Sequence, residues 1–266
     1  MVQKLIFFDI DGTLLNDEKQ LPGSTRQAIN ELQTAGHLVA IATGRAPFAF
    51  KSIQKELNIN SYVSTNGQYV VHDNEVIYKN PITPTILEGL EKYSAERNHP
   101  LVHLNNNDWY SNTKHHPFIK EAIDSLKIGR DVTYDPEFYR DGEVYQTLLF
   151  CADGEAEYNR TFDQLNFVRW HNYSVDVTPS GGSKAEGISR LIRQLQIPAN
   201  DIYAFGDGLN DIEMLRSIQN SFAMGNASDV VKKAASSVTK DVNDDGIWHG
   251  LKMAGLLGKG HSTAAE

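Results

Sequence analysis

Short, continuously apolar runs recur along the chain, and each ends abruptly in polar residues. The runs cover residues 5–8, 38–42 and 202–205, and residues 62–64 are predicted to form a further short strand that ends in a serine. Strands that are buried on both faces of a parallel sheet have this pattern. Predicted helices separate the segments 5–8, 38–42 and 62–64, and an alternation of strand and helix is typical of a doubly wound sheet. The sequence therefore predicts an α/β protein built on a doubly wound parallel sheet.

Capping and turn residues mark the predicted helices. Ser24 and Gln27 have the spacing of a capping box, so a helix is predicted over residues 24–35, before the stop residue Gly36. Pro47 fits the first turn of a helix that runs to about residue 57. Further helices are expected at residues 183–195, 212–217, 229–235 and 246–256, and short strands at 221–224 and 237–239.

The pattern changes after residue 68. A hairpin is predicted over residues 69–78, and a mixture of helices and antiparallel strands follows. Its expected helices are at 85–97, 117–126 and 155–165, and its expected strands at 100–104, 108–111, 144–151, 167–171 and 174–177, before a return linker at 178–182. We expect residues 1–81 and 183–266 to form the core, and residues 82–182 an inserted α+β domain. The tail, residues 258–266, is expected to be disordered.

The amino-acid composition limits the classes of binding partner that the protein can have. A formal net charge of −9 argues against binding to nucleic acid or to an anionic membrane, because phosphates over a broad surface would not be neutralised. A small anionic substrate fits if positive charge is local. Cys151 is the only cysteine, so an internal disulfide is excluded, and its apolar surroundings predict a buried thiol. Without a membrane span or a signal-peptide pattern, a soluble cytoplasmic protein is expected, as a monomer or weak homodimer.

Two carboxylates follow the first strand at an unusual spacing. Asp9 and Asp11 are separated by one residue, so in extended backbone they point to the same side about 6.5 Å apart. Like charges at this distance are destabilising unless a cation lies between them. The alternative is an Asx-turn, in which the carboxylates only accept local backbone N–H bonds.

Three further predicted strands also end in polar residues. Thr43, Asn66 and Asp207 follow them, and the ends of parallel strands lie along one edge of a sheet, where ligands bind. Lys184 is a cation in the first turn of a helix, where the helix dipole favours anions, which suggests a phosphate contact. Acids, a threonine and a lysine together favour phosphoryl transfer with Mg²⁺. An ordinary exposed lysine at 184 and a helix-capping role for Asp211 stay open as alternatives.

Four motifs then resemble those of the haloacid dehalogenase superfamily, and in particular its Cof-type phosphatases of subclass IIB. They are Asp9-Ile10-Asp11-Gly12-Thr13, Ala42-Thr43-Gly44-Arg45, Ser183-Lys184 and Gly206-Asp207-Gly208-Leu209-Asn210-Asp211. They occur in the family's order, each after the expected element. The resemblance implies a Rossmann-like core and, at residues 82–182, a cap domain of the C2B type.

The resemblance also implies roles for individual residues. Asp9 would be the nucleophile that forms an aspartyl-phosphate, and Asp11 the general acid and base. Mg²⁺ would be bound by Asp9, the backbone carbonyl of Asp11 and Asp207, with support from Asp211. The phosphate would contact four further residues: Thr43, Gly44, Lys184 and Asn210. Three others would lie near the substrate: Arg45, Asn66 and Gly67.

The function expected from these residues is Mg²⁺-dependent hydrolysis of a small phosphorylated metabolite, such as a sugar phosphate or a similar phosphomonoester. A phosphomutase acting on a sugar phosphate is one alternative, and a catalytically idle metal-binding regulatory module is another. Substrate choice depends on the cap, where four polar or aromatic residues are candidates but are better explained by packing or surface exposure: Glu143, Tyr145, Trp170 and His171.

Overall fold

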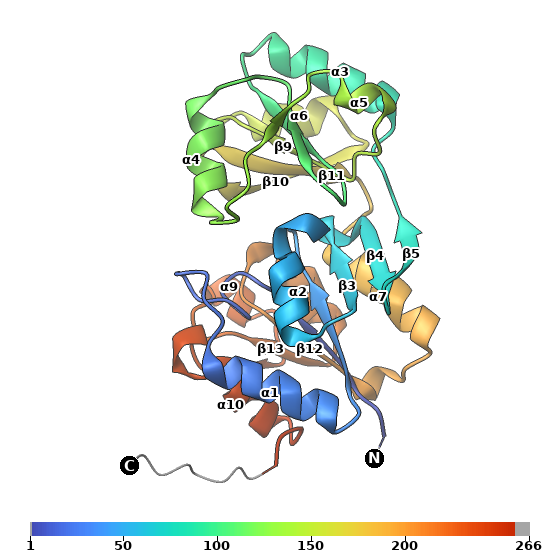
Figure 1. Cartoon of the computed structure of the whole chain (residues 1–266), viewed down its shortest axis with the longest axis vertical. Coiled ribbons are helices and arrows are strands. Elements are labelled where there is room, and N and C mark those ends of the chain that lie inside the picture. Colours follow the sequence, from blue (N-terminus) through green and yellow to red (C-terminus); the bar gives the residue numbers. More distant parts are fainter. Residues whose placement is uncertain (1, 259–266) are drawn as a thin grey trace. The chain divides into compact units, whose positions relative to one another are not determined.

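A computed structural model describes residues 2–258 (Figure 1). The chain forms two compact units. Among the described residues, unit 1 comprises residues 2–42, 54–62 and 192–258, and unit 2 comprises Thr43–Ile53 and Val63–Leu191. Nearly all of the tail that was expected to be disordered lies outside the described residues. The domain boundaries at 81/82 and 182/183 stay a prediction.

Unit 1 is built on parallel strands in the order β14-β13-β12-β1-β2. Their bounds are β1 (Leu5–Phe8), β2 (Leu38–Ala42), β12 (Ile202–Gly206), β13 (Asn220–Ala223) and β14 (Ser237–Val238). All four residues of β1 are buried, because β2 and β12 flank it on both edges and helices cover the sheet. The predicted doubly wound α/β core is confirmed.

Helices of unit 1 come from distant parts of the chain. Helix α1 (Gly23–Thr34) packs against β2 and lies beside α10 (Gly246–Met253) in Figure 1. The shorter α8 (Ile212–Ser217) packs against β12 and β13, and α9 (Asp229–Lys232) against β13. Three 3-10 turns complete the unit: η3 (Ala199–Asp201), η4 (Leu209–Asp211) and η5 (Val242–Asp244).

Helix α2 (Lys51–Leu57) and strand β3 (Ser61–Ser64) are two of the elements that run from one unit to the other. The 3-10 turn η1 (Pro47–Phe50) leads into α2, as the proline predicted. Strand β3 continues into the turn η2 (Thr65–Gly67) and the hairpin of β4 (Tyr69–His72) and β5 (Glu75–Lys79). The hairpin is also as predicted.

Unit 2 contains a second, six-stranded sheet in the order β10-β11-β9-β6-β7-β8. Its strands are β6 (Leu101–Leu104), β7 (Trp109–Ser111), β8 (Thr133–Tyr134), β9 (Gln146–Leu149), β10 (Leu165–His171) and β11 (Ser174–Pro179). One face packs against α3 (Pro84–Ala95), α5 (Phe138–Asp141) and α6 (Glu155–Thr161), and the other against α4 (Pro117–Ser125). Cys151 is buried in the first of these cores, as expected. Helix α7 (Lys184–Leu195) then leaves the unit.

Four local predictions need correction. Ser24 does not cap α1: the N-cap is Pro22, Ser24 lies inside the helix, and its buried hydroxyl has no hydrogen-bond partner. Thr178 and Pro179 belong to β11 rather than to a linker, because they pair with β10. Helix α6 ends four residues earlier than expected, since residue 165 already joins β10. The short elements β8 and α5 were not predicted at all.

Within residues 2–258, no helix combines the length and the apolar character that crossing a membrane requires.

Candidate active site

The parallel pairing of β1 with β12 brings two acidic residues together. Phe8 lies opposite Phe205, and the backbone N–H of Asp9 donates to the carbonyl of Phe205 at 3.0 Å, so the pairing extends one residue past β1. Asp207 follows directly after β12. Because both strands end at the same edge, their two carboxylates meet there despite a separation of nearly 200 residues.

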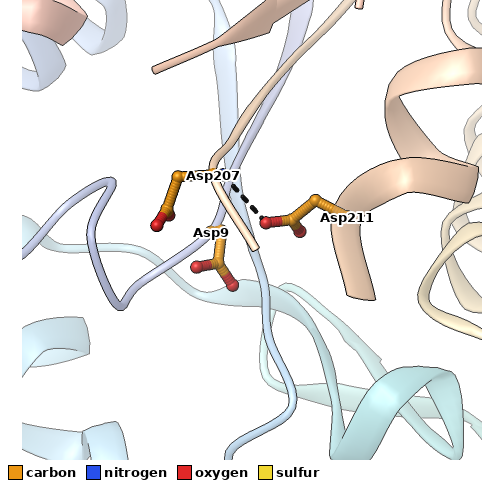
Figure 2. A group of neighbouring side chains, drawn as sticks. All are labelled: Asp9, Asp207 and Asp211. Carbon is orange, nitrogen blue, oxygen red and sulfur yellow. Dashed lines mark hydrogen bonds between the residues drawn. The ribbon is translucent and has the colours of Figure 1, made fainter. Parts of the chain in front are cut away.

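Three carboxylates form an acidic cluster, defined here as Asp9, Asp207 and Asp211 (Figure 2). Each offers an oxygen, and these oxygens lie within 4.8 Å of one another. Asp9 and Asp211 are buried, while Asp207 is partly exposed. Like charges this close repel, which makes such a group costly unless donors or a cation offset it.

Asp211 closes the loop that carries the cluster. Its Oδ2 accepts the backbone N–H of Asp207 at 3.0 Å and that of Gly208 at 2.9 Å. A side chain at Gly206 would collide with it, because a Cβ there would lie 2.6 Å from the Asp211 carboxyl carbon. The capping alternative is thus realised in the loop before α8, and the same carboxylate also belongs to the acidic cluster.

The loop after β1 holds Asp207 from the other side. The Thr13 hydroxyl donates to Asp207 Oδ1 at 2.8 Å. Gly12 has a φ of +79°, and a Cβ at this position would lie 2.2 Å from Asp207 Oδ2. Glycine is therefore required twice here, for its backbone conformation and for the space that Asp207 occupies.

The Asp11 carboxylate lies outside the acidic cluster and forms an ion pair with Lys19 at 2.6 Å. Asn226 stabilises the loop after β1, since its side-chain N–H donates to the Gly12 carbonyl at 2.9 Å. Nothing in the sequence pointed to Lys19 or Asn226. Asn210 is exposed on η4, and a Cβ at Gly208 would lie 2.5 Å from its side-chain Oδ1.

Unit 2 holds the remaining candidates, and backbone hydrogen bonds join two of its loops. The Asn66 N–H donates to the Thr43 carbonyl at 3.1 Å, and the Thr65 N–H donates to the Arg45 carbonyl at 3.0 Å. Thr43 is buried, and its hydroxyl accepts the Arg45 N–H at 3.1 Å. Gly44 lies under the Asn66 amide, because a Cβ there would be 3.1 Å from Asn66 Oδ1. The Thr43–Arg45 and Thr65–Gly67 segments thus form one assembly.

Arg45 reaches into the inserted segment. Its guanidinium donates weakly to the carbonyls of Ala49 at 3.4 Å and Leu126 at 3.5 Å, and the side chain is partly buried. A simple role as an exposed surface charge does not fit these contacts.

The start of α7 packs against Gly67. Gly67 has a φ of +94°, and a Cβ there would lie 2.0 Å from the Ser183 carbonyl. The Ser183 hydroxyl accepts the Glu186 N–H at 3.2 Å and so caps the helix. Lys184 is only 2% exposed. The alternative of an ordinary exposed lysine is therefore wrong, and a buried ammonium at a helix start suits an anionic ligand.

A further ionisable group of unit 2 was missed in the sequence. Desolvation raises the pKa of Asp176, on β11, to about 7, although hydrogen bonds from Asn66 and Gln146 and the charge of Lys184 lower it. Its only sequence signal is an acid between two valines in a strand whose valines are buried. Such an alternation of buried and less buried positions does not by itself predict a function for the acid.

The acidic cluster fits a divalent cation. Carboxylate oxygens are the ligands of hard cations such as Mg²⁺ and Ca²⁺, which bind them at 2.0–2.6 Å. Oxygens within 4.8 Å of one another can contact one such ion. The cluster can therefore hold a divalent metal, with Asp9 as one ligand.

Several known proteins are similar to this chain over most of its length. The sequence profile described as haloacid dehalogenase-like hydrolase matches residues 6–251. A Bacillus subtilis (strain 168) protein named "Putative phosphatase YkrA" is 47% identical over 97% of this chain and 100% of its own length. The crystal structure of a protein from Geobacillus kaustophilus HTA426 matches with a TM-score of 0.90 and 48% identity, covering 96% of this chain and 100% of the other.

A second solved structure carries a functional name. The sugar phosphatase BT4131, of haloacid dehalogenase subclass IIB, matches with a TM-score of 0.86 and 31% identity, covering 96% of this chain and 100% of the other. The family recognised from four motifs is thereby confirmed, and so is the enzyme class. The chain belongs to the haloacid dehalogenase-like hydrolases and is a phosphatase of that family.

Proposed function

We propose that this phosphatase uses Mg²⁺ to hydrolyse a phosphomonoester of a small metabolite, such as a sugar phosphate, through an aspartyl-phosphate on Asp9. The observation that carries the proposal is the acidic cluster, in which the Asp9 carboxylate shares one small volume with Asp207 and Asp211. The name of the subclass IIB relative supports the sugar phosphate as substrate class.

In this mechanism a carboxylate oxygen of Asp9 attacks phosphorus, and the bond from phosphorus to the alcohol oxygen breaks. Asp11 gives its proton to the departing alkoxide. Asp11 then takes a proton from a water molecule that attacks the aspartyl-phosphate, which releases phosphate and restores Asp9. Because Asp11 pairs with Lys19, we expect Lys19 to move aside or to orient this carboxyl during the cycle.

Other residues bind and orient the substrate. We assign phosphoryl contacts to Thr43, Gly44, Lys184 and Asn210, and substrate contacts to Arg45, Asn66 and Gly67. Lys184 is the buried cation of this set, and its charge suits a phosphate oxygen. The metal, held by Asp9, Asp207 and the Asp11 carbonyl with Asp211 in support, would offset the repulsion between Asp9 and an anionic phosphate. A cytoplasmic monomer or weak homodimer is part of the proposal.

Asp9→Asn tests the proposal, with p-nitrophenyl phosphate and a panel of sugar phosphates as substrates. We expect phosphate release with Mg²⁺, its loss with a chelator, and a drop of at least about 1,000-fold in kcat for Asp9→Asn. Asp17→Asn is the matched control, because Asp17 is an exposed acid of the same loop. Isomerised sugar phosphate without phosphate release would indicate a mutase, and metal binding without any turnover would indicate the idle module.

A further inference from the structure

Three polar side chains of unit 2 form a closed hydrogen-bonded group, called here the clamp: Asn66, Gln146 and Asp176. Asn66 Nδ2 donates to Asp176 Oδ2 at 2.8 Å and to Gln146 Oε1 at 3.2 Å. Gln146 Nε2 donates to Asp176 Oδ1 at 2.9 Å. Each carboxylate oxygen thus receives one donor, and both N–H bonds of the Asn66 amide are used.

The clamp lies on the face of the six-stranded sheet that α4 covers. Val175 and Val177 point into the core of α3, α5 and α6, so Asp176 between them points to the opposite face. Gln146 is buried on neighbouring β9, and Asn66 comes from η2. A half-buried carboxyl in this position costs free energy unless its donors are well placed, and apolar residues would pack the sheet more cheaply.

Asn66 links the clamp to the loop that follows β2. The two hydrogen bonds that Asn66 Nδ2 donates fix the orientation of the side-chain amide. The backbone N–H of Asn66 donates to the Thr43 carbonyl. Asn66 has a φ of +50°, a conformation that asparagine tolerates better than most residues. Its amide also lies against Gly44. The carboxyl of Asp176 therefore acts on Thr43 and Gly44 through a single intermediate side chain.

We propose that Asp176 is a positioning residue of the phosphatase: with Gln146 it orients the Asn66 amide, and through Asn66 it holds the Thr43–Gly44 loop in its phosphate-binding arrangement. The inference rests on the proposed function, because this loop matters only if it contacts the substrate. It assigns Asp176 no contact with the reacting atoms.

The hydrogen bonding within the clamp depends on whether Asp176 is charged. As a carboxylate, Asp176 accepts from both carboxamides, whereas a protonated carboxyl has a hydroxyl that competes with one of these donors. Since burial raises the pKa of Asp176 to about 7, this change in hydrogen bonding occurs near neutral pH. Lys184 is the nearby cation that favours the carboxylate.

The other charged groups on elements packed against β11 are engaged elsewhere or exposed. Arg169 of β10 pairs with Glu155, and His171 accepts the Tyr173 N–H. On α4, Lys120 pairs with Asp124, and Glu121 is exposed. Strand β9 carries no charged residue.

Asp176→Asn gives the sharpest test, because asparagine has nearly the shape of a neutral aspartic acid. Below about pH 6 the wild-type side chain is mostly neutral, so kcat/KM of wild type and variant should nearly coincide. Above pH 8 we expect the wild type to exceed the variant about tenfold, mainly through KM. The ratio of the two profiles cancels the titration of the substrate and of every group that the two proteins share, and its midpoint should lie near pH 7. Asp163→Asn, an exposed acid of the same unit, should give a flat ratio near one.

A pH-independent ratio, or a ratio of one throughout, would overturn the proposal. Gln146→Leu provides a second variant that keeps side-chain volume. It should also raise KM, but by a smaller factor than Asp176→Asn does. If the protein lacks phosphatase activity, ¹³C NMR of labelled aspartates still tests the clamp. Asn66→Ala should then shift the Asp176 titration to higher pH, because the carboxylate loses a donor. No shift would contradict the clamp independently of any activity.

Discussion

The acidic cluster of unit 1 and the clamp of unit 2 both contain carboxylates, but they are built in different ways. Asp9 and Asp207 follow the ends of neighbouring parallel strands, so strand topology alone brings them together. Asp176 lies within a strand, and its partners come from β9 and η2. The first arrangement is a property of the fold, whereas the second depends on the choice of individual side chains.

The two regions also differ in charge. The cluster gathers three carboxylates within 4.8 Å, stabilised in part by backbone N–H groups and a threonine hydroxyl, and it suits a cation from solution. The clamp contains a single carboxyl with two carboxamide donors, and the nearby cation, Lys184, belongs to the protein. The cluster is therefore suited to binding an ion, and the clamp to orienting a side chain.

Apart from loss of the proposed nucleophile, the largest effect on activity is expected where the loop after β1 meets Asp207. Gly12→Ala should lower kcat/KM at least about 100-fold, because a Cβ at residue 12 would displace the Asp207 carboxylate. Gly36→Ala is the matched control: its φ of +81° equals that of Gly12 within a few degrees, but nothing lies within 4 Å of its Cβ. It should cost only about 1 kcal/mol of unfolding free energy and leave activity unchanged. Equal losses of activity in both variants would show that backbone strain, and not Asp207, controls the site.

This contrast explains how much the sequence could reveal. Apolar runs that end in polar residues predicted the parallel strands, and with them the approach of Asp9 to Asp207. The resemblance of four motifs supplied the family. Lys184 was singled out because a cation at a helix start opposes the helix dipole, and its burial agrees with that argument.

The missed features depend on contacts between residues far apart in the chain. Ser24 has the spacing of a cap, yet the fold starts α1 one residue earlier. Lys19 pairs with Asp11 because a left-handed turn at residue 19, with a φ of +60°, returns the chain toward that acid. Asp176 gains its role from Asn66, which is 110 residues away. No local pattern contains such information.

Magnesium binding should distinguish the two regions by stability. At a concentration 100 times its Kd, a ligand of the native state stabilises it by about 2.7 kcal/mol, so Mg²⁺ should raise the unfolding temperature. Asp207→Asn removes one anionic ligand and should abolish most of this increase, while Asp176→Asn should keep it. Thermal unfolding with MgCl₂ and with EDTA measures the difference. An increase that persists in Asp207→Asn would place the metal elsewhere.

A smaller effect is expected for the hydroxyl that holds Asp207. Thr13→Val keeps the shape of a fully buried side chain but removes the donor to Asp207 Oδ1. A hydrogen bond to a charged group contributes about 1.5–3 kcal/mol, so Mg²⁺ affinity should fall about tenfold or more. Isothermal titration of Mg²⁺ gives the affinity directly. Thr34→Val, at the exposed end of α1, should not change it.

An effect that leaves the acidic cluster untouched concerns the pH dependence of stability at Asp176. Its native pKa of about 7 lies above the ordinary value of 3.8, so between these values the native state binds more protons than the unfolded state. Stability from this group therefore falls as pH rises from about 4 to 7 and is constant above. With its partial exposure the change is on the order of 2 kcal/mol. Urea unfolding of wild type and Asp176→Asn at pH 5 and pH 8 should show the variant gaining relative to wild type at the higher pH. The same comparison with Asp163→Asn should show no change, and a constant difference for Asp176→Asn would mean that this carboxyl titrates in its ordinary range.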